Sequence, residues 1–336
     1  MGRATVLTFT LPDLEMFSAL PDGGINPHHE MARQESRRWV AQYTNVTFGP
    51  KMKAFYEKCE FELSSSYCYP QLDREGLRAV MDLVNILWFA DEVTDAETGS
   101  GASRTAETVC RTLRDPEYND GTPLCLTGTF CSFRINHLSK AGPETSRRFM
   151  EHCHETFFAF SEEAELRAQG EVLSIAGYLS LRKRNGRGGV RPCFDLAECF
   201  LDMDLPDCVH RLEIFRRGHD AAVDLVGLAN DLYSYNVQQA RGYGTSNIVT
   251  VVMKARKIGL QEASDYVGCL CKTLLSNLQE SQRAIEDLAR DAKDEDSANT
   301  FRDALRALEA YSHWVRGNAI DVAGSARLKA PGLGLA

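Results

Sequence analysis

Helical periodicity is the feature that most restricts what this chain can fold into. From Glu30 to about residue 320, apolar residues recur at the spacing of one helix face, and proline or glycine separates the segments. We find no convincing alternation typical of half-buried strands and no repeat of fixed period. The pattern therefore predicts an all-α protein, one large helical bundle over residues 1–336, without a compositional shift that would mark a linker.

The breaks in the pattern place the individual helices. Residues 1–30 are rich in proline and glycine and are expected to form an irregular strap. Early helices begin at Glu30, Pro50 and Asp73. Later helices are expected at roughly 105–115, 124–140, 144–168, 171–184, 207–240, 260–290 and 296–320. The Gly- and Ser-rich stretch Thr98–Ser103 is expected to be a flexible loop that could move over a neighbouring site.

Charge and cysteine usage narrow the function classes. The net charge of -9 argues against simple electrostatic binding to nucleic acid or to an anionic membrane. No stretch approaches the roughly 20 apolar residues of a membrane span, and no targeting segment is recognised. Eleven cysteines occur without any CxxC pair, which favours unpaired thiols in a reducing compartment. We therefore expect a cytoplasmic protein; the sequence leaves its oligomeric state open, including a homodimer.

The first chemical motif is an acidic stretch at the end of an apolar helix. Asp91-Glu92-Val93-Thr94-Asp95 follows the run from Val80 to Leu87 and presents three carboxylates in five residues. Asp91 and Asp95 lie one helical turn apart on one face, where their charges repel unless a cation lies between them. Taken alone, the motif is more typical of a solvated helix end than of a metal site.

The second motif lies near the end of the helix expected over 207–240. Asn230, Ser234 and Gln238 are spaced by four residues, so their side-chain oxygens share one face over two turns. Amide and hydroxyl oxygens are hard ligands that suit Mg²⁺, with waters or a phosphate completing its coordination. The alternative interpretation is an ordinary polar helix face.

Together, the two motifs resemble those of class I terpene cyclases, and the sequence around them is most similar to fungal sesquiterpene synthases. Further short segments that support this resemblance are distributed over most of the chain: Tyr178–Arg182, Pro192–Glu198, Asn230–Asn236, Asn247–Val252 and Trp314–Asn318. The resemblance implies the class I terpenoid synthase fold, a single-domain helical bundle around a central hydrophobic cavity. It also implies cyclisation of farnesyl diphosphate with release of diphosphate.

The resemblance further assigns roles to individual residues. Three Mg²⁺ ions, for which Mn²⁺ could substitute, are expected between the two motifs. Asp91 would hold two of them, and Asn230, Ser234 and Gln238 the third. Asp95 is a further metal ligand, although for Asp95 and Glu92 a salt bridge is an equal alternative. The resemblance also implies that Arg182 and Arg327 bind the diphosphate and that the helix break at Gly186–Gly189 lies beneath the site. The C-terminal segment 320–336 is expected to close over the site. The expected aromatic cavity walls are Trp88, Phe89 and Trp314.

The chain departs from the family pattern in the second motif and at the C-terminus. Gln238 replaces an expected glutamate, which removes a full charge from the metal site and should weaken Mg²⁺ binding. Val237 occupies a position where many relatives carry a basic residue. The stretch around Ser246 lacks the acidic residues and the histidine that are usual there in relatives. Leu328 replaces the tyrosine of an Arg-Tyr pair.

Two other functions share the same features. The departures favour a non-catalytic or weakly active protein that binds a prenyl diphosphate in the same fold. A chain-elongating prenyltransferase needs a second aspartate-rich motif, which Asn230–Ser234 does not provide. In all three cases the partner is a small isoprenoid diphosphate, and the sequence does not identify the product.

Overall fold

The computed structural model describes residues 9–44, 49–95, 97–115, 117–118, 124–185, 189–242 and 244–324. Within these ranges the regular structure is helical and no strand occurs, which confirms the predicted all-α class. The elements in chain order are η1 (Leu14–Ala19), α1 (His29–Thr44), α2 (Pro50–Cys59), α3 (Phe61–Cys68), α4 (Arg74–Asp95), α5 (Gly99–Arg114), α6 (Leu124–Asn136), η2 (Leu138–Lys140), α7 (Pro143–Gln169), α8 (Ile175–Asn185), α9 (Val190–Phe200), α10 (Asp207–Arg211), α11 (Glu213–Arg241), η3 (Gly244–Ser246), α12 (Ile248–Arg256), α13 (Leu260–Arg290) and α14 (Glu295–Gly324).

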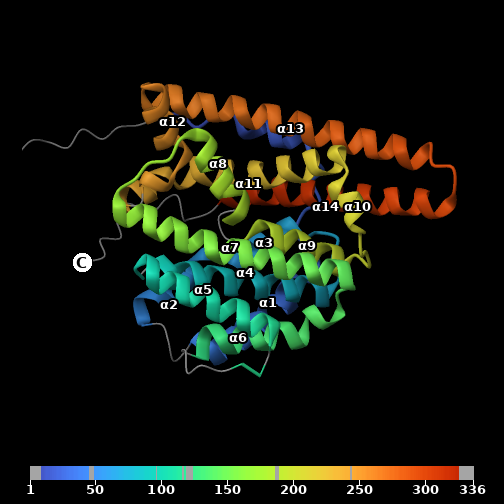
Figure 1. The fold of residues 1–336 in the computed structure, drawn as a ribbon, viewed down its shortest axis with the longest axis horizontal. Helices are drawn as coiled ribbons and strands as arrows, with labels where there is room; N and C mark the ends of the chain where they lie inside the picture. The colour runs from blue at the N-terminus through green and yellow to red at the C-terminus, as the bar shows by residue number, and fades with distance from the viewer. Residues whose placement is uncertain are drawn as a thin grey trace, which may run out of the picture.

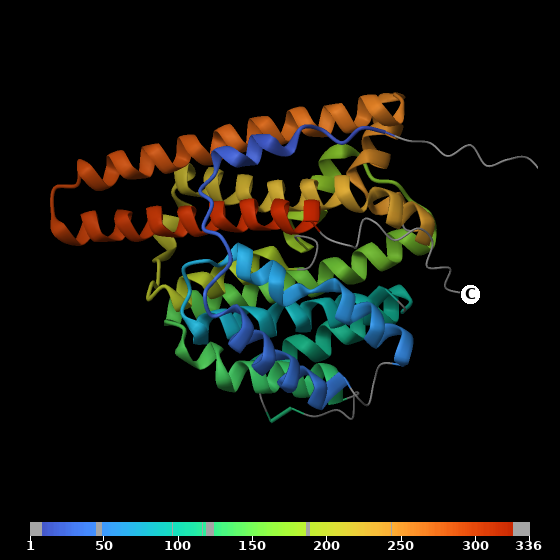
Figure 2. The same cartoon turned by 180° about the vertical axis from the view of Figure 1, so that it is seen from behind.

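The helices form two layers that meet along α3, α7 and α9. Figures 1 and 2 show α11, α12, α13 and α14 on one side and α1, α4, α5 and α6 on the other. Contacts of α3 and α9 with α14 on one side and with α4 on the other join the layers. The α13–α14 hairpin projects beyond the other helices in both views. No helix among the described residues is long and apolar enough to cross a membrane.

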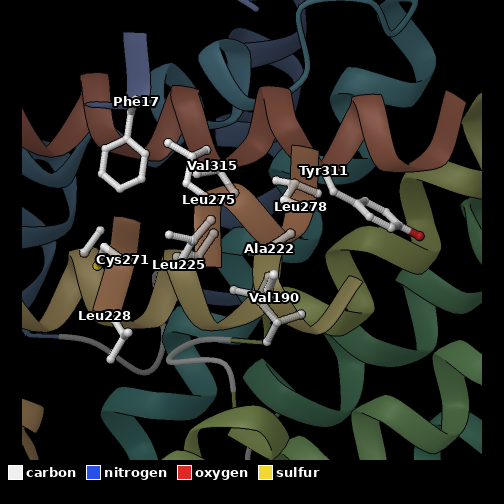
Figure 3. Packing of buried hydrophobic residues seen from close by; sticks show 14 of the residues in the cluster. Phe17, Val190, Ala222, Leu225, Leu228, Cys271, Leu275, Leu278, Tyr311 and Val315 are labelled. Carbon is white, nitrogen blue, oxygen red and sulfur yellow. The ribbon is translucent and has the colours of Figure 1, made fainter. Parts of the chain in front are cut away.

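Each layer has its own hydrophobic core. One core gathers the apolar faces of α11 to α14 around residues such as Leu225, Leu275 and Tyr311, as Figure 3 shows. The other core is centred on α4, which is buried on nearly all sides because it lies inside the second layer. Trp314 of α14 packs against both cores and therefore lies where they meet.

Local capping explains where the helices that carry the motifs begin and end. The side chain of Asp73 accepts a hydrogen bond from the backbone of Gly76 at 2.7 Å, which caps the start of α4. Helix α11 ends at Arg241 and is capped by Gly242, whose φ of 81° is left-handed. The backbone then turns through η3, and the side chain of Asn247 caps α12 by accepting from Val249.

One predicted loop is wrong. The stretch Thr98–Ser103 does not form a flexible loop, because Thr98 is the N-cap of α5 and helix begins at Gly99. The first turns of α5 are tied to the molecule: Ala102 is buried, and the hydroxyl of Thr105 donates to Glu97. Burial and capping thus overcome the low helix propensity of glycine and serine.

Candidate active site

A small pocket brings residues of both sequence motifs together: Asp91 and Asp95 of the first motif and Gln238 of the second, whereas Asn230 and Ser234 are not among its lining residues. Its lining comes from the C-terminal ends of α4 and α11, from α7 and α8, and from η3. The lining residues are Asp91, Asp95, Phe160, Glu163, Arg167, Arg182, Gln238 and Ser246. Side chains that are 147 residues apart in the sequence, Asp91 and Gln238, therefore face the same small space.

The two aspartates of the first motif occupy the last turn of α4. Both side chains line the pocket, as expected for residues one turn apart on one helix face. The carboxylate of Asp95 forms an ion pair with Arg167 of α7 at 2.8 Å. Asp95 therefore has the salt-bridge partner that the sequence left as an alternative to metal binding.

The second motif lies on the last turns of α11. Asn230 and Ser234 are half-buried, and Gln238 is buried. The side-chain oxygen of Gln238 accepts a hydrogen bond from the amide of Asn247 at 2.8 Å. Because Asn247 also donates to the backbone carbonyl of Asp231 at 2.8 Å, the start of α12 fixes both Gln238 and the motif helix.

Arg182 is held in the pocket by several acceptors. Arg182 is only 4% exposed, and its guanidinium donates to the Tyr178 hydroxyl at 2.7 Å and to the backbone carbonyl of Ser246 at 2.7 Å. It also pairs with Glu163 of α7 at 3.2 Å. Burial alone would lower the pKa of Arg182, but Glu163, Tyr178 and Asp231 together raise it well above its usual value. Arg182 therefore remains a fixed cation in the pocket.

Asp231 anchors this arrangement from behind, although the sequence assigned it no role. Its carboxylate is fully buried and accepts from the Tyr178 hydroxyl and from the backbone of Ile248 at 3.1 Å. It also lies 3.7 Å from Arg182. Asp231 thus ties α8 and the start of α12 to α11. Its position beside Asn230 in the motif was the only sequence signal for such a role.

Glu163 is a further site residue that the sequence did not predict, as are Phe160 and Arg167 of the same helix. Besides Arg182, its carboxylate accepts from the Asn185 amide at 2.8 Å. Asn185 is the last residue of α8, so Glu163 fixes the point where that helix ends. The sequence does not distinguish Glu163 from the other glutamates of Glu162-Glu163-Ala164-Glu165. Only its tertiary contacts differ from theirs.

The charges of the site favour divalent cations. Asp91, Asp95 and Glu163 line the pocket with Arg167 and Arg182, and Asp231 lies behind Arg182. Four carboxylates against two guanidiniums leave a net negative charge, which repels a diphosphate unless cations bind with it. The described residues contain no ready cluster of three His, Cys, Asp or Glu ligands. A metal here would therefore need the amide and hydroxyl oxygens of α11 and oxygens of the ligand itself.

The predicted aromatic walls have different surroundings. Trp88 and Phe89 pack with Tyr56, at ring-centroid distances of 5.5 Å each, in an aromatic cluster between α2, α3 and α4. Trp314 instead lies edge-on to Phe194 and Tyr69, where the two cores meet. Of the three, Trp314 is the one that packs against both cores.

Some predicted features fall outside the described residues. Arg327 and Leu328 belong to the segment 325–336, and Gly186, Arg187 and Gly188 separate α8 from α9. The interruption itself is where the sequence predicted it, since α8 ends at Asn185 and α9 starts at Val190. The backbone of Gly189 has a left-handed φ of 86°, and a side chain there would collide with Leu87 of α4.

Comparison with known proteins points to one family. Residues 82–277 match terpene synthase family 2, C-terminal metal binding. Viridiflorene synthase Agr2 of Cyclocybe aegerita is 51% identical over 313 residues, which are 93% of this chain and 79% of that protein. A sesquiterpene synthase of Sphaerobolus stellatus is 46% identical over 93% of this chain and 87% of its own length.

Solved structures agree on the fold. A crystal structure of a-eudesmol synthase superposes with a TM-score of 0.76 at 21% identity, covering 95% of this chain and 99% of that one. Hedycaryol synthase in complex with nerolidol gives a TM-score of 0.76 at 20% identity over 93% of this chain and 99% of that one. At these identities the likeness concerns the fold alone.

Proposed function

The chain belongs to terpene synthase family 2, among the sesquiterpene synthases of basidiomycetes, and from this premise we propose that it ionises farnesyl diphosphate and cyclises the resulting carbocation. The products would be a cyclic C15 compound and free diphosphate. The observation that carries this proposal is that Asp91 and Asp95 of the first motif, Gln238 of the second motif and a buried arginine line one pocket. We take residues 1–336 as one catalytic domain.

The donor set of the pocket fits Mg²⁺. Carboxylate, amide and hydroxyl oxygens are the ligands this ion prefers, and it accepts phosphate oxygens and waters as the remainder. Asp91 would hold metal from the α4 side, and Asn230, Ser234 and Gln238 from the α11 side, with Asp95 as a further ligand or as the partner of Arg167. We propose three ions, replaceable by Mn²⁺. When bound, they would stabilise negative charge on the departing diphosphate.

The protein groups then have separable tasks. Arg182 and, by resemblance, Arg327 would bind the diphosphate, and Asp231 and Tyr178 would keep Arg182 oriented. The two apolar cores and Trp314 would exclude water from the carbocation, since aromatic faces stabilise cations without offering a nucleophile. In the described residues the cysteines form no disulfide, which supports a cytoplasmic location.

The direct test is incubation of the purified chain with farnesyl diphosphate and Mg²⁺, with gas-chromatographic analysis of volatile products. We expect a C15 hydrocarbon or alcohol from the parent chain. The Asp91→Asn variant should lose at least about 100-fold in turnover, because removing a group aimed at developing charge typically costs that much. Arg302→Gln, which disrupts an exposed ion pair with Glu295, is the matched control and should retain activity.

The rival functions predict other outcomes of the same experiment. Tight binding of a farnesyl diphosphate analogue without turnover would identify a non-catalytic binding protein, the alternative favoured by Gln238. Longer prenyl diphosphates formed with added isopentenyl diphosphate would identify a prenyltransferase. The absence of any product from C10 to C20 prenyl diphosphates would overturn the cyclase proposal.

A further inference from the structure

Gly227 occupies an unusual position in the middle of α11. It is buried, it lies three residues before Asn230 and seven before Ser234, and it therefore shares their helix face. Glycine in a helix interior destabilises that helix relative to alanine, so a glycine at such a position requires a packing or functional reason.

Packing does not supply that reason. Apart from its two chain neighbours and the nearby backbone of its own helix, a Cβ atom built on Gly227 would meet no atom within 4 Å among the residues that the structure describes. Gly218, two and a half turns earlier on the same helix, behaves in the opposite way. Its Cβ would lie 2.7 Å from the Cβ of Ser281 on α13 and 3.0 Å from Leu308 on α14. Gly218 therefore allows close helix contact, whereas Gly227 borders an interior space.

The chemistry of the helix face changes at Gly227. One turn before it lies Val223, an apolar side chain that belongs to the core around α11. One and two turns after it lie the oxygen-bearing side chains of Asn230 and Ser234. The space beside Gly227 is thus at the border between an apolar wall and the proposed metal-diphosphate site. A prenyl diphosphate has the same border, between its hydrocarbon chain and its charged head.

On this basis, and resting on the proposed function, we propose that Gly227 is a specificity-determining position whose missing side chain leaves room for the carbons next to the diphosphate. A side chain at position 227 would project into the volume in which the prenyl chain folds after ionisation. The size of the residue would then decide which cyclisation products the cavity admits.

The experiment compares Gly227→Ala and Gly227→Leu with the parent chain. With farnesyl diphosphate and Mg²⁺, Gly227→Ala should change the ratio of products by at least about twofold, since one methyl group is commonly worth that much in a hydrophobic pocket. Its melting temperature should equal or exceed that of the parent, because alanine improves the helix and meets no neighbour. Gly177→Ala on α8 is the matched helix-glycine control and should leave the product ratio unchanged.

Binding separates this proposal from the proposed function. By calorimetry with Mg²⁺, Gly227→Leu should bind a thio-linked, non-ionising farnesyl diphosphate analogue about tenfold more weakly, but inorganic diphosphate equally well. If the parent makes no product, the cyclase proposal fails and the binding comparison still decides the role of Gly227. Equal affinity of parent and Gly227→Leu for the farnesyl analogue would overturn the inference. A clear drop in the melting temperature of Gly227→Ala would overturn it as well.

Discussion

At the scale of single residues, Gln238 sets the charge of the metal site. Its oxygen accepts from Asn247, and a glutamate at this position would keep that hydrogen bond while adding a negative charge. We therefore expect Gln238→Glu to lower the Mg²⁺ concentration for half-maximal turnover by roughly threefold to tenfold, because carboxylate ligands bind this ion more tightly than amides.

The neighbouring Gln239 provides the matched control for this titration. It is exposed and its amide donates to Thr250 at 3.0 Å, so Gln239→Glu adds the same charge to the chain on another side of α11. The Mg²⁺ dependence of Gln239→Glu should stay close to that of the parent. Equal shifts in both variants, or none in Gln238→Glu, would count against Gln238 as a metal ligand.

At the scale of helices, α7 restrains α8 through Glu163. The carboxylate of Glu163 pairs with Arg182 and accepts a hydrogen bond from Asn185. Arg182 is also the arginine that the diphosphate would bind. A ligand must therefore compete with Glu163 for Arg182. We expect Glu163→Gln to bind inorganic diphosphate with Mg²⁺ about threefold to tenfold more tightly, because a competing charge is removed. Isothermal titration calorimetry measures this affinity directly.

Glu162 is the control for Glu163. It pairs with Arg184 at 2.8 Å on the surface, where both side chains are more than a third exposed, and such pairs contribute little. Glu162→Gln should leave diphosphate binding unchanged. Weaker binding in Glu163→Gln would instead show that its carboxylate helps to hold the metal ions.

The contact between α8 and α11 also makes stability depend on pH. Burial raises the pKa of Asp224 to about 7, while Lys183 lowers it and Asp220 raises it further. The Oδ1 atom of Asp224 is buried without a hydrogen-bond partner in the described residues. A raised carboxyl pKa means that the folded state binds a proton more tightly than the unfolded state, so stability falls as pH rises from about 4 to about 7.

Asp224→Asn should remove this penalty. We expect its free energy of unfolding at pH 8 to exceed that of the parent by on the order of 1 kcal/mol, and the difference to shrink toward pH 5. Asp220 should behave oppositely: burial would raise its pKa, but His219 and Lys183 lower it, so Asp220→Asn should destabilise the protein at neutral pH. Chemical denaturation at several pH values measures both, and equal pH profiles for parent and Asp224→Asn would contradict this explanation.

At the scale of the whole molecule, periodicity and breaks predicted the helical class and most helix positions. The break between α8 and α9 and the span of α13 follow the sequence closely, because proline, glycine and apolar spacing act locally. The motifs on α4 and α11 were also readable, since each repeats oxygen-bearing residues at helical spacing. These features depend on neighbours a few residues away.

The residues that hold Arg182 in place could not be predicted from the sequence in the same way. Glu163, Asp231 and Tyr178 gain their roles from contacts between α7, α8 and α11, and such contacts leave no local pattern. The stretch after Thr98 misled the sequence interpretation because its composition is typical of loops, whereas packing of Ala102 and Thr105 makes it helical. Tertiary contacts therefore decided both the network around Arg182 and the start of α5.

The central claim is that metal ions and diphosphate bridge the ends of α4 and α11. Crystals grown with Mn²⁺ and inorganic diphosphate test it, because anomalous scattering locates each ion. We expect ions between Asp91 on one side and Asn230, Ser234 and Gln238 on the other, with Arg182 contacting the diphosphate. Ions bound away from these residues, or diphosphate bound with no ion on the α11 side, would contradict the claim.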